Sequence, residues 1–288
     1  MASNLQEAGY ELVVNDIRRH VAEPHLSAGA EWADSAAQVA EAVDVVFTSL
    51  PTPPDVESVA ASLLPNLAAG KVYFDLSTNS PTLVRQLHAE FQARGVHMLD
   101  APVSGGPAGA RSGKLAIWVG GEENIFQTNK KLLGAIGDQV MYVGPIGAGS
   151  VAKLVHNCAG YMIQCALAEA FTMGVKAGVE PLALWQAVRQ GAVGRQRTFD
   201  RLPDHFLSAK FDPPDFALRL AHKDVSLATA VGREHRVPMR MANLALEELT
   251  EALNRGWDER DSRVAMLLQE ERAQLEISVD EERLRQAI

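Results

Sequence analysis

Three polar residues, Lys153, Asn157 and Gln164, interrupt an otherwise apolar stretch that runs from Gly147 to Lys176. They stand at positions i, i+4 and i+11, which places them within roughly 60° of one another on one helix face. Burying an unpaired ammonium costs several kcal/mol or lowers the pKa of the amine. Lys153 therefore either reaches solvent near the N-terminal end of the helix or serves a purpose in a buried site.

The segment that carries these residues is predicted to form one long helix over residues 149–176, because it contains no proline. Apolar residues lie almost all round it, which is the pattern of a buried helix. Its roughly 28 residues, at about 1.5 Å each, would span about 40 Å, enough to cross between two lobes. Cys158 and Cys165 lie two turns apart on it, too far apart for a disulfide with each other. We expect both to be core residues in a protein of the reducing cytoplasm.

A second candidate segment is the glycine-rich sequence from Asp100 to Gly121, which follows a predicted strand. Open α/β sheets bind their ligands at the carboxyl ends of the strands, where this segment begins. Gly105 and Gly106 leave backbone N–H groups uncovered, and Ser104 adds a hydroxyl. Together these groups can hold a carboxylate. The alternative is a glycine-rich crossover loop without a ligand.

The elements that must position these residues alternate between strands and helices over residues 1–146. Short apolar strands are predicted at residues 10–15, 43–49, 72–75, 96–99, 115–119 and 140–143. Helices are predicted between them at residues 1–8, 35–42, 55–64, 80–94 and 124–136. This alternation predicts a doubly wound parallel sheet of the Rossmann type.

From residue 149 onward only helices are predicted, at residues 149–176, 181–190, 216–235, 238–255 and 262–285. The sequence thus predicts an α/β domain over residues 1–146 and an all-helical domain over 147–288, joined by the long helix. The last segment is rich in charge, and we expect residues 256–273 to form a helix with a charged face and no chemistry. Residues 263–288 are expected to be solvated or to lie at a dimer edge.

Composition excludes several classes of partner. The chain has 288 residues, with 27 basic and 36 acidic side chains, so its net charge is −9. This charge argues against nucleic acid or an anionic membrane as the main partner. No apolar run is long enough for a transmembrane span, and no signal peptide is predicted.

Asp16, at the end of the first predicted strand, stands where a dinucleotide-binding domain has the acidic residue that holds the ribose diol. A carboxylate there favours NAD, whereas Arg18 and Arg19 could pair with a 2′-phosphate and allow NADP. The glycine fingerprint would lie about 20 residues earlier, and no Gly-x-Gly-x-x-Gly occurs at a first strand-to-helix turn. We therefore expect a Rossmann-like domain without its first strand, as in a truncated chain or one with a misplaced start.

The segment Asp100–Gly121 is similar to the substrate-binding signature of the β-hydroxyacid dehydrogenase family, which includes 3-hydroxyisobutyrate and tartronate semialdehyde dehydrogenases. Gly147-x-Gly149-x-x-x-Lys153 with Asn157 resembles the family's catalytic helix. The resemblance covers essentially the whole chain. It implies that Lys153 is a general acid/base and that Asn157 binds substrate together with the segment Ser104–Gly106. His156 stands where the family usually has the first of two asparagines.

Other segments resemble the cofactor contacts of this family. Leu50–Pro51 and Ser77–Pro81, which includes Thr78, look like its cofactor-contacting loops after successive strands. Lys223, in the pair Lys223–Asp224, resembles the lysine that closes over the site near the nicotinamide. Without the resemblance, this pair would be taken for a solvated helix face. The resemblance thus implies that Asp16, Leu50, Pro51, Thr78 and Lys223 contact the cofactor.

The implied reaction is hydride transfer between C4 of a nicotinamide and the carbinol carbon of a small β-hydroxyacid, in a cytoplasmic homodimer or homotetramer. An imine reductase would share the architecture but typically lacks the lysine at position 153. A phosphogluconate-type dehydrogenase would have a much longer helical half. A non-catalytic interaction module, which dimerises through the helices, is the alternative from another class. Residues of the helical half that could shape a pocket include Arg195, Arg197, Phe206 and Phe211.

Overall fold

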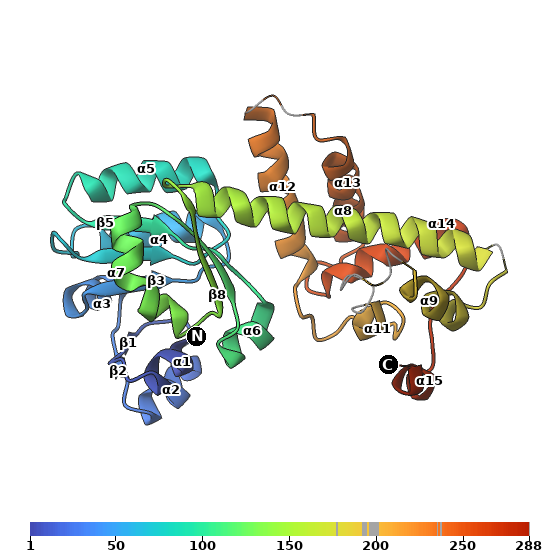
Figure 1. Cartoon of the computed structure of the whole chain (residues 1–288), viewed down its shortest axis with the longest axis horizontal. Helices are drawn as coiled ribbons and strands as arrows, with labels where there is room; N and C mark the ends of the chain where they lie inside the picture. The colour runs from blue at the N-terminus through green and yellow to red at the C-terminus, as the bar shows by residue number, and fades with distance from the viewer. Residues whose placement is uncertain (177, 192–194, 196–201, 235, 237, 288) are drawn as a thin grey trace. The chain divides into compact units, whose positions relative to one another are not determined.

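The computed structural model describes residues 1–176, 178–191, 195, 202–234, 236 and 238–287 (Figure 1). The chain divides into two compact units, Met1–Val155 and His156–Ile288. Helix α8 (Ala148–Lys176) is continuous through this division, so it belongs to both units. The predicted boundary at residues 146 and 147 lies just before the helix begins. Among the described residues, no helix is long and apolar enough to cross a membrane.

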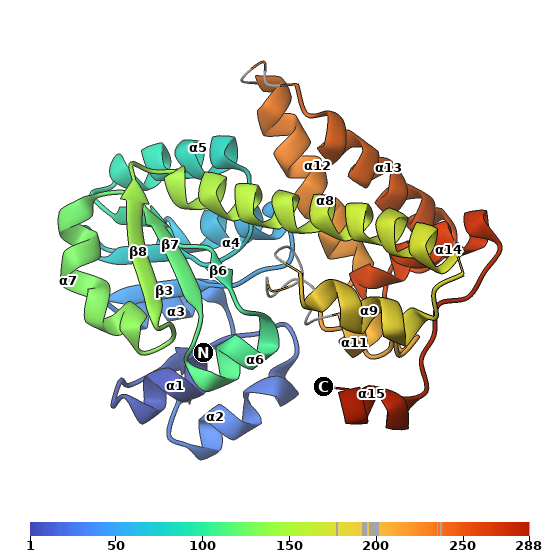
Figure 2. The ribbon, with the colours of Figure 1, turned by 45° about the vertical axis from the view of Figure 1, so that its right-hand side comes forward.

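The first unit is built on a six-stranded sheet (Figure 2). Five of its strands follow the order β3-β4-β5-β7-β6, and the sixth, β8, also pairs with β7. The strands are β3 (Val45–Thr48), β4 (Val72–Asp75), β5 (His97–Asp100), β6 (Val103–Ser104), β7 (Ala116–Gly120) and β8 (Gln139–Gly144). The pairs β3–β4, β4–β5 and β7–β8 are parallel, as predicted.

One part of the sheet differs from the predicted parallel arrangement, since β7 runs antiparallel to both β5 and β6. Only Ala101 and Pro102 separate β5 from β6, so the two strands act as one bent strand that pairs with β7. Helix α6 (Gly106–Ser112) then forms the connection of a long hairpin. The sequence did not reveal β6 or α6, because the glycines of this segment suggested a loop.

The strand predicted at residues 10–15 is reduced to β1 (Val13–Val14), which pairs in parallel with β2 (Glu31–Trp32). These two strands form a sheet of their own, separate from the six-stranded sheet. Between them lie two short elements that the sequence did not predict, η1 (Arg19–Ala22) and α2 (Glu23–Ser27). Helix α3 (Ala36–Ala42) follows β2 and leads to β3, the first strand of the six-stranded sheet.

Helices cover both faces of the six-stranded sheet. They are α1 (Ala2–Glu7), α3 (Ala36–Ala42), α4 (Pro53–Leu63), α5 (Pro81–Gln92) and α7 (Glu123–Gly134). Successive residues of β4 point to opposite faces: Tyr73 packs with the core under α3, α4 and α5, and Phe74 with the core under α1 and α7. Both side chains are fully buried, which fixes the register of the strand.

The second unit is helical. Besides α8, its elements are α9 (Pro181–Arg189), α11 (Leu202–His205), α12 (Leu218–Glu234), α13 (Arg240–Asn254), η2 (Ser262–Met266), α14 (Leu267–Ala273) and α15 (Glu281–Ala287). The helices predicted at residues 181–190, 216–235 and 238–255 are confirmed, with ends that agree within two residues. Phe206 and Phe211 are buried in the core of this unit, Arg195 Nε donates to the carbonyl of Gln190, and Arg197 lies outside the described residues.

The prediction of a single helix over residues 262–285 is wrong. Gln274 has a left-handed backbone with φ of 52°, which ends α14, and an extended segment follows before α15. Ile277 and Val279 of that segment are buried, so the chain gains apolar burial by leaving the helix. Two acidic residues of the predicted charged face, Asp261 and Glu270, are buried rather than solvated.

Helix α8 is apolar on most of its surface but is not buried all round, contrary to the prediction. Leu154 and Cys158 are 2% and 3% exposed, whereas Val155 and Ile163 are 64% and 43% exposed. The buried side chains of Leu154 and Cys158 pack in the interior. The exposed ones are apolar side chains that the rest of the described chain leaves uncovered.

Candidate active site

A buried carboxylate fastens the beginning of α8 to the sheet. Asp100, the last residue of β5, is 1% exposed. Its Oδ1 accepts a hydrogen bond of 2.7 Å from the Gly147 amide, and its Oδ2 accepts one of 2.6 Å from the Ser150 amide. Burial raises the pKa of Asp100 to about 6, against the opposing effect of these amides. The carboxylate thus satisfies amides at the helix start that have no partner within the helix.

Two glycines permit this close approach of helix and sheet. A Cβ atom on Gly149 would lie 2.3 Å from the Trp118 carbonyl oxygen. A Cβ atom on Gly120 would lie 2.5 Å from Asp100 Oδ1 and 2.8 Å from the Gly149 amide nitrogen. Only glycine therefore fits at either position without movement of the backbone. The predicted domain-joining turn at Gly147–Gly149 is in effect a docking point for α8.

Lys153 lies on α8 one turn beyond Ser150, and only 8% of the residue is exposed. A lysine whose ammonium simply reached solvent would keep a larger exposed surface. The interpretation as a solvent-reaching lysine is therefore not supported. An amine held in a buried position on a docked helix is suited to proton transfer, because its surroundings are fixed.

Asn157 lies one helical turn after Lys153 and takes part in a polar cluster of the second unit. Its Nδ2 donates a short hydrogen bond to Oδ2 of Asp224, on α12. Asp224 is fully buried, and the Lys223 ammonium lies 3.1 Å from its Oδ1. The Lys223 side chain is only 19% exposed, so the pair is not a solvated helix face. The structure joins Asn157 and Lys223 through Asp224, a residue that the sequence did not assign to the site.

The predicted carboxylate-binding residues are placed where β6 passes into α6. Ser104 ends β6 and pairs with Ala116 of β7. Gly105 and Gly106 have φ angles of 134° and 59° and are exposed. These positive φ angles favour glycine. The geometry is compatible with an anion held by the amides and the serine hydroxyl.

The loops after β3 and β4 meet at one edge of the sheet, as the order of the strands requires. The Leu50 amide donates a 2.9 Å hydrogen bond to Ser77 Oγ. Asp75, at the end of β4, accepts from the Ser77 amide at 3.0 Å and from Asn79 Nδ2 at 2.9 Å. Burial raises the pKa of Asp75, and these hydrogen bonds oppose the rise. Pro51 is exposed and Thr78 half-buried, so both are accessible at this edge.

Asp16 follows β1 and has a partly exposed carboxylate. The Arg18 amide donates to its Oδ1 at 2.8 Å, and the Arg18 guanidinium lies 3.7 Å from the same oxygen. The Arg19 guanidinium lies 5.0 Å from the centre of the Trp32 ring and 3.8 Å from Asp34. Of the two arginines, Arg18 is therefore the one held beside the predicted ribose-binding carboxylate.

The described residues fit part of a dinucleotide. Asp16 offers an acceptor for a ribose diol, and the joined loops at Leu50 and Ser77–Asn79 offer a surface at the carboxyl ends of the strands. The glycine-rich turn that usually surrounds the pyrophosphate does not occur in residues 1–288. The fit of these residues to a dinucleotide therefore rests on Asp16 and on the two loops at Leu50 and Ser77–Asn79.

Two protein-family models match consecutive parts of the chain. The NAD binding domain of 6-phosphogluconate dehydrogenase matches residues 1–144, which is half of the chain. The NAD-binding domain of NADP-dependent 3-hydroxyisobutyrate dehydrogenase matches residues 147–268. The first match ends and the second begins just before α8, so the two models correspond to the α/β part and the helical part.

The NAD-dependent L-serine dehydrogenase of Pseudomonas aeruginosa is 33% identical over 276 residues, which cover 93% of this chain and 93% of the relative. The chain belongs to the β-hydroxyacid dehydrogenase family. Mitochondrial 3-hydroxyisobutyrate dehydrogenase of Rattus norvegicus is 32% identical over 280 residues, covering 94% of this chain and 84% of the relative. The solved structure of 3-hydroxyisobutyrate dehydrogenase from Mycobacterium tuberculosis with L-serine gives a TM-score of 0.82 at 26% identity, over 93% of each chain.

These matches confirm the resemblance seen in the sequence. As a member of the β-hydroxyacid dehydrogenase family, the chain is an NAD(P)-dependent oxidoreductase. The relatives are dehydrogenases, which favours this activity over an imine reductase or a non-catalytic module. The roles of individual residues remain predictions.

Proposed function

We propose that this β-hydroxyacid dehydrogenase oxidises a small β-hydroxyacid at its carbinol carbon, with Lys153 as the general acid/base. The observation that carries the proposal is the burial of Lys153 on a helix whose start is fixed by Asp100. Burial disfavours the charged form of an amine, and a general base must be neutral when it accepts a proton. The bound NAD(P) supplies the acceptor for the hydride.

Each of the remaining predicted residues has a distinct task in this proposal. The Lys153 amine takes the proton of the substrate hydroxyl during oxidation and returns it during reduction. Ser104 and the amides of Gly105 and Gly106 hold the substrate carboxylate. Asn157 orients the substrate, and its hydrogen bond to Asp224 restricts the amide to one position. Asp224 is thus proposed as a positioning residue.

The substrate class follows from the chemistry of the proposed contacts. L-serine and 3-hydroxyisobutyrate, which the names of two relatives contain, both carry a hydroxyl on the carbon β to a carboxylate. A carboxylate site at Ser104–Gly106 and a base at Lys153 suit this pair of groups. We therefore propose a small β-hydroxyacid of this kind as substrate.

Turnover with defined hydroxyacids tests the proposal. The purified chain is mixed with NAD or NADP and with 3-hydroxyisobutyrate, L-serine or, as a control without the hydroxyl, isobutyrate. We expect reduced cofactor to form with at least one hydroxyacid and not with isobutyrate. Absence of turnover with every β-hydroxyacid, in a chain that binds the cofactor, would contradict the proposed substrate class.

Cofactor choice, assembly and location are further parts of the proposal. The Asp16 carboxylate supports a preference for NAD, because it would repel a 2′-phosphate, although Arg18 beside it leaves NADP possible. Exposed apolar side chains on two helices, Val155, Ile163, Met241 and Leu244, support a homodimer or homotetramer. Cys158 and Cys165 are not joined in a disulfide, which is compatible with the proposed cytoplasmic location.

A further inference from the structure

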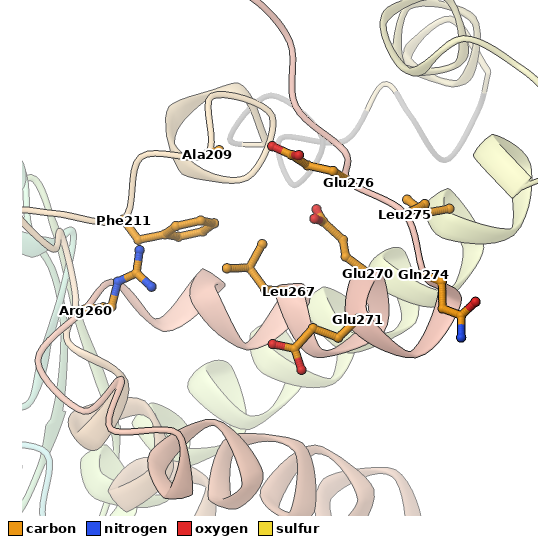
Figure 3. Close-up of a pocket in the computed structure, with 9 residues that line it drawn as sticks. All are labelled: Ala209, Phe211, Arg260, Leu267, Glu270, Glu271, Gln274, Leu275 and Glu276. Carbon is orange, nitrogen blue, oxygen red and sulfur yellow. The ribbon is translucent and has the colours of Figure 1, made fainter.

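A cavity of about 410 Å³ lies within the second unit, beside α14 (Figure 3). Its apolar lining includes Phe211, Leu267 and Leu275, and two of its acidic residues are Glu270 and Glu276. Figure 3 shows the Glu270 carboxylate directed from α14 into the space between Leu267 and Glu276. The volume is in the range of cavities that bind small molecules, which is about 300 to 1,000 Å³.

Glu270 is the unusual member of this lining. The residue is 6% exposed, and its Oε1 has no hydrogen-bond partner among the residues that the structure describes. A buried polar atom without a hydrogen-bond partner carries an energetic cost, so such atoms are rarely left unsatisfied. The carboxylate that carries this oxygen is directed into the cavity in Figure 3, so the cavity is a place for a hydrogen-bond donor.

The other charged groups of the lining are already paired. Arg260 Nε lies 3.1 Å from Asp212 Oδ2, and the Arg260 guanidinium lies 5.3 Å from the centre of the Phe211 ring. Glu271 forms a close ion pair with Arg255, and Figure 3 shows its side chain on the other side of α14 from Glu270. The negative charge that remains at the cavity comes from Glu270 and from the exposed Glu276, which accepts a 3.4 Å hydrogen bond from Ser278 Oγ, so the cavity favours a cation.

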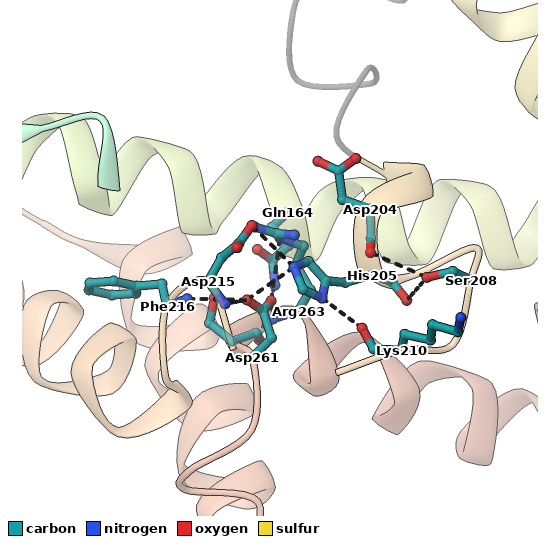
Figure 4. Close-up of polar contacts among 10 residues, drawn as sticks. Gln164, Asp204, His205, Ser208, Lys210, Asp215, Phe216, Asp261 and Arg263 are labelled. Carbon is teal, nitrogen blue, oxygen red and sulfur yellow. Dashed lines mark hydrogen bonds and ion pairs between the residues drawn. The ribbon is translucent and has the colours of Figure 1, made fainter. Parts of the chain in front are cut away.

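A polar cluster of the same unit has contacts of its own (Figure 4). His205 Nδ1 lies 2.6 Å from the Lys210 carbonyl oxygen, and His205 Nε2 lies 3.2 Å from Asp215 and 3.5 Å from Asp261. Arg263 lies 3.4 Å from Asp261 and 3.8 Å from Asp215. Both carboxylates of this cluster therefore already have an arginine beside them.

We propose that the Glu270 cavity binds a small organic ammonium ion, whose charged group pairs with Glu270 and Glu276 and whose apolar body packs on Phe211, Leu267 and Leu275. A bare divalent metal ion fits the lining less well, because such ions take six or more oxygen ligands and half of this wall is apolar. A neutral apolar ligand would leave the Glu270 oxygen unpaired. This site is separate from the proposed catalytic residues and does not depend on their roles.

The ionisation of Glu270 gives the site a dependence on pH. Burial and the neighbouring Glu276 raise the pKa of Glu270 to about 7, against a hydrogen bond from the Ile277 amide. The pKa in the folded state lies above the unfolded value, so Glu270 contributes stability below about pH 4.5 that is lost as the pH rises through 7.

Calorimetric titration with benzylammonium tests the proposal, with benzyl alcohol and calcium chloride as comparison ligands. At pH 8 we expect saturable binding of benzylammonium and none of the alcohol. Because the ionised fraction of Glu270 falls about tenfold between pH 8 and pH 6, the affinity should weaken roughly tenfold over that range. Glu270→Gln should weaken binding at pH 8 by at least about tenfold, whereas Glu247→Gln, at an exposed position of α13, should not.

The following results would decide against the proposal. Equal binding to the Glu270→Gln variant, or no saturable binding to the unaltered chain at pH 8, would overturn it. Tighter binding of calcium than of benzylammonium, lost in the same variant, would assign the cavity to a metal ion. Folding of the variant is checked by its melting temperature. Because a buried carboxylate has been removed, the melting temperature of the variant minus that of the unaltered chain should increase as the pH increases from 5 to 8.

Discussion

Replacing Lys153 by alanine is expected to lower kcat by about 10²- to 10⁴-fold while the affinity for NADH changes by less than about threefold. The physical reason is that the substrate hydroxyl would lose the group that takes its proton, whereas the predicted cofactor contacts are on other residues. Steady-state kinetics with the best hydroxyacid, together with a fluorescence titration of NADH, measure the two quantities separately.

Two controls distinguish a chemical role of Lys153 from a structural one. Lys176→Ala removes an exposed lysine from the far end of the same helix and should leave kcat unchanged. Small primary amines added to the Lys153→Ala variant should restore part of the lost rate, because they can take the proton in place of the missing side chain. A variant that turns over at nearly the original rate would remove Lys153 from the mechanism.

Replacing Gly149 by alanine is expected to destabilise the first unit by about 3 kcal/mol and to reduce activity together with stability. The new Cβ would lie 2.3 Å from the Trp118 carbonyl oxygen and 2.8 Å from the Asp100 carbonyl oxygen, and backbone atoms cannot turn aside as side chains do. The start of α8 would have to move, which would break the hydrogen bonds from Gly147 and Ser150 to Asp100. The expected fall in melting temperature is roughly 6 to 12 °C.

Gly160→Ala is the matched control, since Gly160 lies on the same helix and an added Cβ would meet nothing within 4 Å. Alanine is favoured over glycine inside a helix by about 1 kcal/mol, so the melting temperature should rise by roughly 2 to 4 °C. If Gly149→Ala melted like Gly160→Ala, the close docking of α8 against β5 and β7 would be wrong.

The sequence predicted those parts of the fold that depend on local pattern. Ser35 accepts the Gln38 amide and starts α3, as the capping pattern indicated. The long proline-free stretch forms α8 within one residue of the predicted start. The positions of Ser104, Gly105 and Lys153 followed from motifs whose residues lie close together in the chain.

The carboxylates that organise the candidate site could not be predicted in this way. Asp100 binds amides 47 and 50 residues later, and Asp224 meets Asn157 across 67 residues. No local pattern shows which strand end will face which helix. Glu270 was missed for a related reason: in a charge-rich segment, only the left-handed turn at Gln274 and the packing after it decide which carboxylate is buried.

The most direct test of the central claim, that this chain is an NAD(P)-dependent hydroxyacid dehydrogenase, is a titration of NADH and NADPH into purified residues 1–288. A version extended upstream to the next in-frame start serves as a comparison. The account predicts saturable binding of NADH to residues 1–288, tighter than that of NADPH because of the Asp16 carboxylate. No saturable binding of either nucleotide to either version would contradict it and would favour an interaction module.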